Sequence, residues 1–255
     1  MASPSHSKAP EYLHSKNSHT LDSPLSALPE MLKLVTATSL LDVGCGTGTW
    51  LRAALENGIQ DVWGVDGVHV PAAQLHVSPD LIRFADLTQP WVAHRRFDLV
   101  LCLEVAEHLE PAAAGTLIDT LVTHSDHIFF SGACPGQPGQ HHVNCQWPDY
   151  WQRLFNERGF VCEDEIRWQI WETASIETWY RQNLFLARRD SANAGKEPRI
   201  PAVVHPEMIP SLRAAHEFEG VAEAATAIEA GSMPVSWYLS TPLKALAAKA
   251  ARRFT

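Results

Sequence analysis

A glycine-rich turn early in the chain has the residue types and spacing of a ligand-binding loop. Glycine occupies alternate positions of this turn, at Gly44, Gly46 and Gly48. Glycines permit backbone conformations that a side chain would block, and they let a ligand approach the main chain closely. An apolar run precedes the turn, and a helix predicted over residues 50–57 would direct its unpaired N–H groups toward such a ligand. The stretch favours a binding turn, although an ordinary strand–turn–helix without a ligand has the same outline.

The spacing and charge of the turn indicate which ligand it would suit. A dinucleotide fingerprint requires its third glycine at the position of Thr49. The carboxylate of Asp42 would repel a pyrophosphate and attract a cation. S-adenosylmethionine carries both an ammonium and a sulfonium group. The stretch resembles motif I of the class I S-adenosylmethionine-dependent methyltransferases. This resemblance implies that the cofactor is bound by Asp42, Gly44, Cys45, Gly46, Thr47 and Gly48.

Two further acidic residues follow the next predicted strands. Asp66 lies about twenty residues beyond the first glycine, the distance at which a carboxylate meets ribose hydroxyls. One carboxylate can accept from two hydroxyls, so we assign Asp66 and its neighbour Gly67 to the cofactor. In the methyltransferase family an acidic residue after the third strand accepts from the adenine amine. This implies the same role for Asp86 and a ring contact for Leu87, with an ordinary turn as the alternative.

A charged string after the fourth predicted strand points to a small acceptor. Its sequence, EVAEHL over residues 104–109, resembles the E-V-x-E-H-L string of methyltransferases that act on small molecules. The resemblance implies that Glu104 and Val105 lie near the methionine end of the cofactor. It also implies that His108 contacts cofactor or acceptor, although a histidine packed in the core is an equal alternative. The N-P-P-Y or D-P-P-Y string of nucleic-acid amine methylases does not occur at this place, which argues against a DNA base as acceptor.

A polar and aromatic loop, residues 136–151, holds the candidates for catalysis. It follows a predicted strand at the edge where open α/β sheets bind their ligands. Methyl transfer from a sulfonium is an in-line displacement, and a hydroxyl acceptor needs a base, for which histidine is the usual side chain. We therefore expect His142 or His141 to be this base. The neighbours that would orient the acceptor and line its pocket are Asn144, Gln146, Trp147, Tyr150 and Trp151.

The same loop resembles the string G-x-H-H-[VI]-N-x-Q-W-P-x-Y-W of a bacterial subgroup of methyltransferases with members near natural-product and surface-sugar genes. The subgroup tends to carry Glu where this chain has Cys145, so the role of this position stays open. Two other interpretations compete: the histidines could hydrogen-bond the loop to itself, or they could join Cys145 in a zinc site. The spacing shows no standard pair of zinc ligands, so we expect no metal.

These residues need a scaffold, and the hydrophobic pattern predicts one. Apolar runs alternate with amphipathic segments, which favours parallel strands joined by helices. The predicted strands cover residues 39–43, 61–66, 81–85, 97–103, 126–131, 160–166 and 180–188. The clearest helices cover residues 111–124 and 148–158. We expect an α/β fold with a Rossmann-like, seven-stranded, mostly parallel sheet and helices on both faces. The family resemblance implies that the last strand is antiparallel.

The chain divides into three predicted parts. Residues 1–37 form an N-terminal cap, residues 38–189 the cofactor-binding domain, and residues 190–255 a linker and helical C-terminal extension. In the methyltransferase family the N-terminal region often builds a lid, and its candidates here are Tyr12, His14 and His19. Aromatic residues near the seventh predicted strand, such as Trp179 and Tyr180, are expected in the core. Of the polar residues Arg181 and Asn183 in that strand, one would face the pocket.

Composition narrows the class of protein. The formal net charge of −9, without a basic run along the main body, disfavours binding to nucleic-acid phosphates. Five scattered cysteines without a C-x-x-C pair, a polar N-terminus and the lack of a membrane-length apolar run indicate a soluble, cytoplasmic protein. The expected partner is a small-molecule acceptor, with neither nucleic acid nor membrane, and a homodimer is compatible with the sequence.

The resemblance implies transfer of a methyl group from S-adenosylmethionine to a hydroxyl, or less favourably an amine, of a small metabolite in natural-product or sugar biosynthesis. The same sulfonium activates the aminocarboxypropyl arm of the cofactor. Transfer or cyclisation of that arm, with release of methylthioadenosine, is therefore an alternative. A module that binds the cofactor without turnover is a third.

Overall fold

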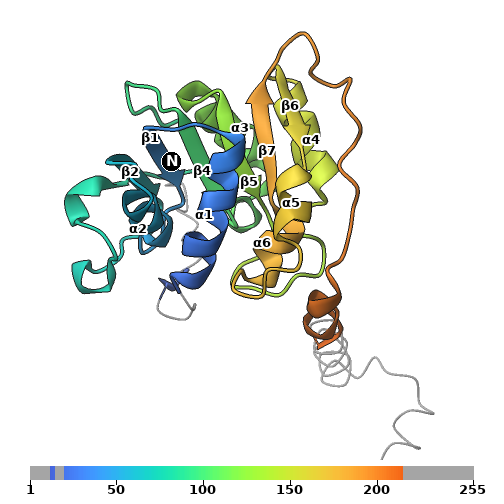
Figure 1. Cartoon of the computed structure of the whole chain (residues 1–255), viewed down its shortest axis with the longest axis horizontal. Coiled ribbons are helices and arrows are strands. Elements are labelled where there is room, and N and C mark those ends of the chain that lie inside the picture. Colours follow the sequence, from blue (N-terminus) through green and yellow to red (C-terminus); the bar gives the residue numbers. More distant parts are fainter. Residues whose placement is uncertain (1–11, 15–19, 215–255) are drawn as a thin grey trace, which may run out of the picture. The chain divides into compact units, whose positions relative to one another are not determined.

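The computed structural model describes residues 12–14 and 20–214, and its centre is a seven-stranded sheet. The strands are β1 (Ser39–Val43), β2 (Asp61–Asp66), β3 (Ile82–Phe84), β4 (Leu99–Leu103), β5 (His127–Ser131), β6 (Phe160–Glu163) and β7 (Phe185–Arg189). Across the sheet they lie in the order β3-β2-β1-β4-β5-β7-β6 (Figure 1). The expected seven-stranded Rossmann-like sheet is thereby confirmed.

Strand direction brings the predicted binding residues to one edge of the sheet. β1 pairs in parallel with β2 and β4, and β4 pairs in parallel with β5. The last strand, β7, is antiparallel to both β5 and β6, as expected. The chain order reverses between β1 and β4, and open α/β sheets bind ligands outside the carboxyl ends of the strands at such a switch point. Gly44 directly follows β1 and Glu104 directly follows β4, so both lie there.

Helices cover both faces of the sheet (Figure 1). They are α1 (Asp22–Leu34), α2 (Thr49–Glu56), α3 (Ala114–His124), α4 (Pro148–Asn156), α5 (Glu165–Ile170) and α6 (Thr178–Asn183). α3 and α4 bury Leu117 and Phe155 in the core on one face. α1, α2 and α5 bury Leu28, Leu51 and Ile166 in the core on the other. Every residue of β1 and β4 is buried, which explains their nearly continuous apolar sequences.

Short 3-10 turns connect or begin several of these elements. They are η2 (Ala72–Gln74), η3 (Pro79–Leu81), η4 (Ala106–His108), η5 (Pro111–Ala113) and η6 (Pro206–Met208). The helix expected over residues 111–124 therefore begins as η5 and continues as α3. Proline suits the first position of such a turn, because its missing N–H would have no partner there. The strand expected over residues 160–166 ends three residues early, since α5 begins at Glu165.

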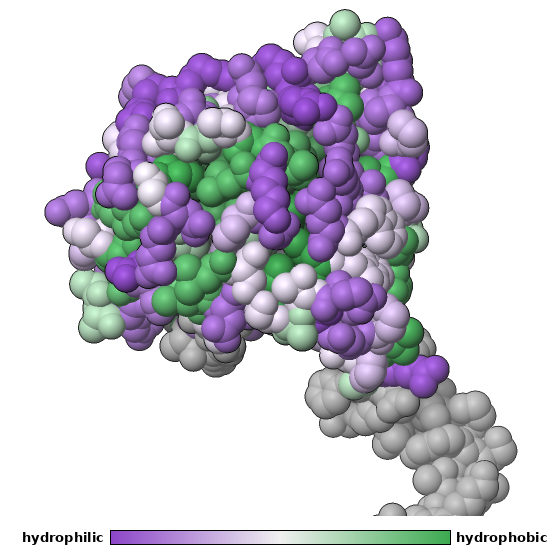
Figure 2. All heavy atoms as spheres, in the orientation of Figure 1, coloured by the Kyte–Doolittle hydropathy of each residue, from purple (hydrophilic) through white to green (hydrophobic). Residues whose placement is uncertain are grey.

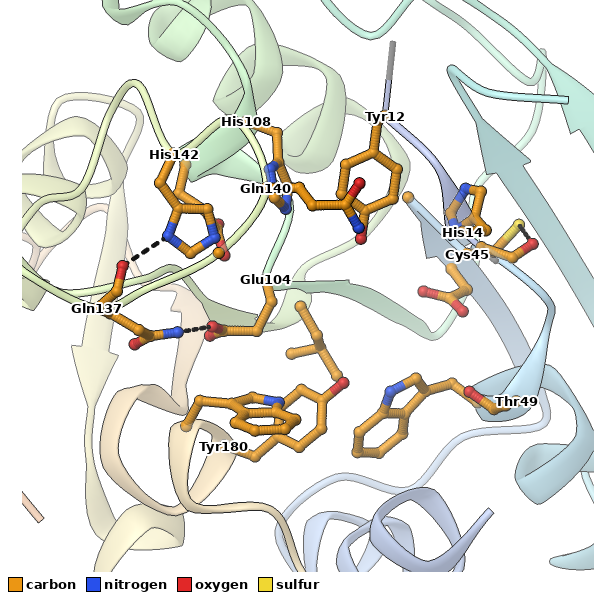
Figure 3. Close-up of a pocket in the computed structure, with 18 of the residues that line it drawn as sticks. Tyr12, His14, Cys45, Thr49, Glu104, His108, Gln137, Gln140, His142 and Tyr180 are labelled. Carbon is orange, nitrogen blue, oxygen red and sulfur yellow. Dashed lines mark hydrogen bonds between the residues drawn. The ribbon is translucent and has the colours of Figure 1, made fainter. Parts of the chain in front are cut away.

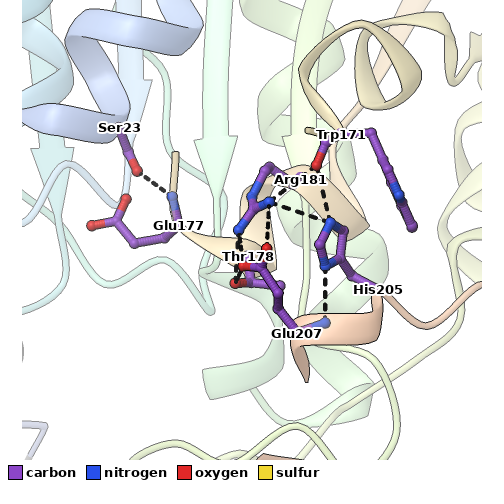
Figure 4. A network of polar contacts seen from close by, with 7 residues as sticks. All are labelled: Ser23, Trp171, Glu177, Thr178, Arg181, His205 and Glu207. Carbon is purple, nitrogen blue, oxygen red and sulfur yellow. Dashed lines mark hydrogen bonds and ion pairs between the residues drawn. The ribbon is translucent and has the colours of Figure 1, made fainter. Parts of the chain in front are cut away.

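The segment after residue 177 differs from the expected strand. Residues through Asn183 form the helix α6, and β7 begins only after it. Arg181 and Asn183 are each only 3% exposed, so this helix buries polar side chains that need partners from elsewhere in the chain. Arg181 donates to the carbonyl oxygen of Trp171 at 3.0 Å and forms an ion pair with Glu207 (Figure 4). These tertiary contacts override the strand preference of the neighbouring aromatic residues.

The chain divides into two compact units after Ile209. The first unit contains the whole sheet together with residues 190–209, which the sequence assigned to the C-terminal extension. This segment is held by Gln152, whose Oε1 accepts from the Ile200 N–H at 2.9 Å and whose Nε2 donates to the Pro198 carbonyl at 3.0 Å. The predicted C-terminal helix lies largely in residues 215–255, outside the described residues.

The surface seen in Figure 2 is mostly hydrophilic, with hydrophobic side chains showing between the polar ones near its centre. Exposed apolar atoms are normal on folded proteins, because there is too little polar surface to cover them. In the part of the chain that the structure describes, no helix combines the length and the apolar character needed to cross a membrane.

Candidate active site

The turn after β1 has a shape that requires glycine. Gly44, Gly46 and Gly48 have φ values of +80°, +52° and +80°, in the left-handed region that other residues rarely adopt. A Cβ atom on Gly44 would lie 2.2 Å from Cγ2 of Val105, so the turn and the segment after β4 are in close contact. Gly48 is also the N-cap of α2, whose first N–H groups therefore follow the turn directly.

Asp66 ties this turn to the end of β2. Its Oδ2 accepts from the Gly46 N–H at 2.7 Å, and its Oδ1 accepts from the Val68 N–H at 2.7 Å. Nε2 of His14 lies 3.6 Å from the same Oδ1. Each carboxylate oxygen has two acceptor sites, so both can still accept from ribose hydroxyls. Asp66 therefore has the position and the remaining lone pairs that its predicted role requires.

The turn buries polar atoms that have no partner among the described residues. Asp42 is 2% exposed, and its Oδ2 accepts no hydrogen bond in that part of the structure. Burial, together with the nearby charge of Asp66, raises the pKa of Asp42 to about 8. Oγ1 of Thr47 is likewise buried without a partner within the described ranges. A cationic ligand in the adjoining cavity would satisfy the carboxyl of Asp42, so this turn fits S-adenosylmethionine.

Two adjoining cavities lie at the switch point. The first has a volume of about 310 Å³ and the second about 200 Å³, and both are lined by Gly44, Glu104 and His108. Among the predicted cofactor residues, the first cavity also contains Asp42, Cys45 and Gly46. The second contains Asp66, Gly67, Asp86, Leu87 and Val105. Thr47 and Gly48 line neither cavity and contribute through the shape of the turn.

Asp86 forms an ordinary turn at the edge of the second cavity. Its Oδ1 accepts from the N–H of Thr88 at 2.9 Å and from the hydroxyl of Thr88 at 2.6 Å, which is the ordinary turn. Asp86 and Leu87 nevertheless both line the second cavity. The turn thus fixes the carboxyl at the edge of the cavity, and its adenine contact stays a prediction.

Glu104 is held in an unusual conformation at the end of β4. Its φ of +55° is rare outside glycine, and such strain often aims a side chain at a functional site. The carboxylate accepts from Nε2 of Gln137 at 2.7 Å (Figure 3). It also accepts from Nδ2 of Asn183 at 3.3 Å. Burial raises the pKa of Glu104. The side chain is therefore oriented by two amides that arrive from a loop and from α6.

Sequence reasoning missed Gln137 and only named Asn183 as one of two candidates. Nδ2 of Asn183 also donates to Oε1 of Gln137 at 2.9 Å, so the two amides hold each other as well as Glu104. Of the two candidates, Asn183 contacts this site while Arg181 pairs with Glu207. A polar residue in an apolar stretch was the only local signal, and it does not specify a partner.

The histidine loop is fixed across η4 by backbone hydrogen bonds. The N–H groups of Val143 and Asn144 donate to the carbonyl oxygen of Glu107 at 2.8 and 3.1 Å. This places the imidazole of His142 with its ring centroid 5.0 Å from that of His108 (Figure 3). His142 lines the first cavity, whereas the exposed His141 lines the second.

Burial disfavours the protonated form of both His108 and His142, which lie side by side in the first cavity. Burial lowers the pKa of His108 to about 4, with the nearby His142 adding to the effect. Burial also lowers the pKa of His142. Nδ1 of His142 lies 2.9 Å from the carbonyl oxygen of Gln137 and must donate to it. The neutral ring of His142 therefore has its lone pair on Nε2.

Glu107 is a second residue that the sequence did not single out. It is 1% exposed, its carboxyl group lies beside that of Glu104, and no side-chain amide, hydroxyl or cationic group within residues 12–14 and 20–214 donates to it. Burial and the neighbouring Glu104 raise its pKa. Ligand atoms of Glu107, His108 and His142 all lie within 4.8 Å of one another. The spacing of ligands along the chain predicts no metal site, yet the fold brings together three groups that can bind one.

The predicted acceptor residues shape the loop and line neither cavity: Asn144, Gln146, Trp147, Tyr150 and Trp151. Nε2 of Gln146 donates to Oδ1 of Asn144 at 3.2 Å. Trp151 is 1% exposed and packs in the core, with its ring centroid 5.2 Å from that of Phe130. Acceptor contacts by Asn144, Gln146, Trp147 and Tyr150 stay predictions, while Trp151 is a core residue.

Two aromatic residues that the sequence assigned to the core also line the first cavity, and one of them, Tyr180, packs against the core as expected. Trp179 and Tyr180, on α6, form part of its wall together with Trp50 of α2. The rings of Trp50 and Tyr180 meet edge to face with centroids 5.3 Å apart. The helical conformation of residues 178–183 turns both side chains toward this cavity, which a period-two strand pattern would not do.

Of the three N-terminal residues predicted to form a lid, two line the cavities. Tyr12 and His14 line both cavities, and the ring of Tyr12 lies 4.7 Å from that of His108 between centroids. The third candidate, His19, lies outside the described residues. Two of the three candidates thus border the site, as a lid requires.

A comparison with protein families matches residues 13–165, more than half of the chain, to a methyltransferase domain. The chain belongs to this methyltransferase domain family. It is a methyltransferase, and its methyl donor is S-adenosylmethionine. No curated relative matches the chain.

Solved structures of methyltransferases are similar to this chain at low sequence identity. DesVI from Streptomyces venezuelae is 13% identical with a TM-score of 0.49, over 65% of this chain and 92% of that one. Magnesium protoporphyrin IX methyltransferase (ChlM) from Synechocystis PCC 6803 with bound SAH is 19% identical with a TM-score of 0.47, over 67% and 82%. The plantazolicin methyltransferase BpumL, in complex with a monoazolic desmethylPZN analog and SAH, is 13% identical with a TM-score of 0.47, over 67% and 83%.

Proposed function

We propose that this methyltransferase acts on a hydroxyl group, or less favourably an amine, of a small metabolite that binds in the first cavity. S-adenosylmethionine supplies an activated methyl group, so the protein needs mainly to align the acceptor, exclude water and deal with the acceptor's proton. The glycine turn, Asp42 and Asp66 would hold the cofactor. Glu104 and Val105 would lie at the methionine end, and Asp86 with Leu87 at the adenine.

The observation that carries this proposal is the orientation of His142. Because Nδ1 donates to the Gln137 carbonyl, the free lone pair of the neutral ring lies on Nε2 at the first cavity. A lone pair in this position can activate an acceptor hydroxyl. His141 remains the second candidate, but it is exposed and lines the second cavity, on the cofactor side. We therefore favour His142.

The charges of the first cavity support a small acceptor without phosphate groups. Asp42, Glu104 and Glu107 all line it. Carboxyl groups in a cleft raise the local concentration of neutral hydrogen-bonding or cationic ligands and disfavour anions. Together with the net charge of −9, this supports a metabolite and not a nucleic acid as the acceptor. The aromatic wall of Trp50, Trp179 and Tyr180 would bind its apolar surface.

Product analysis tests the proposal directly. The full-length protein is incubated with S-adenosylmethionine and a panel of hydroxylated and amino metabolites, and both cofactor products are quantified by mass spectrometry. Methyl transfer releases S-adenosylhomocysteine and adds one methyl group to the acceptor. Release of methylthioadenosine would instead establish chemistry on the aminocarboxypropyl arm. Binding of the cofactor without either product across the panel would favour a non-catalytic module.

A pair of adjacent histidine variants tests the assignment of His142. We expect His142→Ala to lower kcat by about 10²–10⁴, the usual contribution of a group that deals with the acceptor's proton. His141→Ala should lower it by less than about tenfold, because His141 is exposed and lines the second cavity and not the first. A reversed order of the two variants would transfer the assignment to His141.

A further inference from the structure

We propose that Glu107, His108 and His142 bind a divalent transition-metal ion in the first cavity, and that this ion holds and activates the acceptor hydroxyl. The inference rests on the proposed function, because it specifies how the lone pair of His142 is used. One carboxylate and two imidazoles form a mixed oxygen and nitrogen set that suits Mn²⁺, Co²⁺ or Zn²⁺. With three ligands from the protein, further positions stay open for acceptor oxygen and water.

The distances support a ligand set that needs little rearrangement. The ligand atoms of the three residues lie within 4.8 Å of one another. Metal bonds of about 2.1 Å place neighbouring ligands about 3 Å apart and opposite ones about 4.2 Å apart. Small side-chain movements would therefore close the three groups around an ion. The backbone already holds them together, since the Val143 and Asn144 N–H groups donate to the carbonyl of Glu107.

The second observation is the buried carboxylate of Glu107. It is 1% exposed, and no side-chain amide, hydroxyl or cationic group among the described residues donates to it; its carboxyl group instead lies beside that of Glu104. Nδ1 of His108 is also buried and without a partner there. Buried carboxylates are normally hydrogen-bonded, paired or bound to a metal. A cation in contact with Glu107 and His108 would satisfy both groups at once.

The surroundings of His142 resemble those of a metal-bound histidine. Ligating histidines usually donate their other ring N–H to a carbonyl or carboxylate, which fixes the tautomer. Nδ1 of His142 donates to the Gln137 carbonyl at 2.9 Å, and the side-chain amide of the same Gln137 donates to Glu104. Glu104 adds a second carboxyl group beside Glu107, which favours a cation further. Gln137 thus supports the proposed site through both its main chain and its side chain.

A cation at this place would promote loss of the proton from the acceptor hydroxyl. An acceptor oxygen bound to a divalent ion loses its proton at a lower pH, as metal-bound water does. The proton passes to water, the acceptor oxygen forms a bond to the methyl carbon, and the bond from that carbon to sulfur breaks. The neutral thioether leaves with the electron pair, so no oxidant or further reactant is needed.

Metal binding by the full-length protein tests the site without any acceptor. Protein treated with a chelator and dialysed is titrated with Co²⁺, followed by its visible absorption, and with Mn²⁺, followed by calorimetry. We expect one ion per chain, and affinity at least about tenfold lower in Glu107→Gln and in His142→Ala. His141→Ala, one residue away on the same loop, should bind within about twofold of the wild type. Equal binding by all four proteins, or no binding by the wild type, would overturn the proposal.

A second measurement uses only the wild type, so its result does not depend on whether the variants fold. Substoichiometric Mn²⁺ should broaden the imidazole NMR signals of His108 and His142 before that of the exposed His94. Equal broadening of all three would also overturn the site. Chelator-resistant methyl transfer by metal-free protein would overturn the site and leave the proposed function intact. Specific metal binding without any formation of S-adenosylhomocysteine would support the metal site and contradict the proposed function.

Discussion

At the scale of single residues, burial decides what a carboxyl group can do. Asp42 sits at the end of β1 with one oxygen that no described residue contacts, and burial raises its pKa to about 8 from an ordinary value of 3.8. Between these pH values the folded protein retains a proton that the unfolded chain has lost. The contribution of Asp42 to the free energy of unfolding is therefore greatest below pH 3.8. It falls as the pH rises and is lost above about pH 8.

We expect Asp42→Asn to change stability and cofactor binding in opposite directions. At pH 9 the variant should gain about 2–5 kcal/mol in free energy of unfolding, because it no longer buries a charge. The gain should shrink steadily toward pH 5. Urea unfolding of the cofactor-free protein at pH 5, 7 and 9 measures this. Affinity for S-adenosylmethionine at pH 8.5 should fall about tenfold by calorimetry, because the attraction for its positive groups is lost.

Asp98 provides a control of opposite sign. Its carboxylate accepts from the backbone and hydroxyl of Thr38, and these hydrogen bonds lower its pKa. Asp98→Asn should therefore destabilise the protein at pH 7, with an effect that fades as the pH falls below 3.8. A gain for Asp42→Asn that stays constant across pH would contradict the burial argument.

Gly44 and Gly58 separate backbone strain from the function of the turn. Both have positive φ, +80° and +89°, but a Cβ on Gly44 would meet Val105 at 2.2 Å while one on Gly58 would meet nothing within 4 Å. Each Ala variant should lose about 1–2 kcal/mol of stability from strain, with a further loss at Gly44 from the clash. Only Gly44→Ala should lose cofactor affinity, by at least about tenfold in calorimetry. An equal loss of affinity in Gly58→Ala would mean that general destabilisation is the cause.

At the scale of elements, α6 joins the C-terminal segment to the cavity wall. It carries Tyr180 and Asn183 toward the site, while Arg181 on the same helix pairs with Glu207 near η6 (Figure 4). Arg181 is 3% exposed, so the loss of its carboxylate partner would leave a buried charge without compensation. The geometry of the cavity wall therefore depends on an ion pair that lies outside the cavity.

Glu207→Ala should loosen α6 without unfolding the sheet. We expect amide hydrogen exchange of residues 178–183 to become about tenfold faster, with α2 unchanged, as measured by mass spectrometry. Glu163→Ala is the matched control, because Glu163 pairs with Arg188 where both side chains are about 40% exposed, and such pairs contribute little. If both variants left α6 unchanged, the ion pair would have no positioning role.

At the scale of the whole molecule, the N-terminal segment borders a site built from residues 42–180 of the same unit. Tyr12 lines both cavities and contacts His108 ring to ring. Tyr12→Ala should lower cofactor affinity about five- to tenfold, because the cover over the cavities loses its ring. Tyr12→Phe keeps the ring and should bind within about twofold of the wild type. Calorimetry with S-adenosylmethionine measures both, and equal affinities in all three proteins would argue against a lid.

The strands, the glycine turn and Asp66 could be predicted because each depends on neighbours in the sequence. The apolar runs of β1 and β4 are long enough to be recognised as buried parallel strands. Gly44 and Asp66 lie at the ends of consecutive paired strands, so their separation along the chain predicts their proximity. The helix α6 could not be predicted in this way, since its buried Arg181 and Asn183 are stabilised by partners far along the chain.

By itself, the sequence determined the class of fold, the binding turn and the cofactor, since local patterns and short spacings are enough to specify them. Only the tertiary structure decided which polar groups meet at the first cavity. Glu107 and His142 meet because the loop at Val143 is hydrogen-bonded to the backbone of η4, and Gln137 and Asn183 meet at Glu104. Such contacts arise when buried polar groups from distant segments must satisfy one another, and no periodicity or spacing along the chain encodes that pairing.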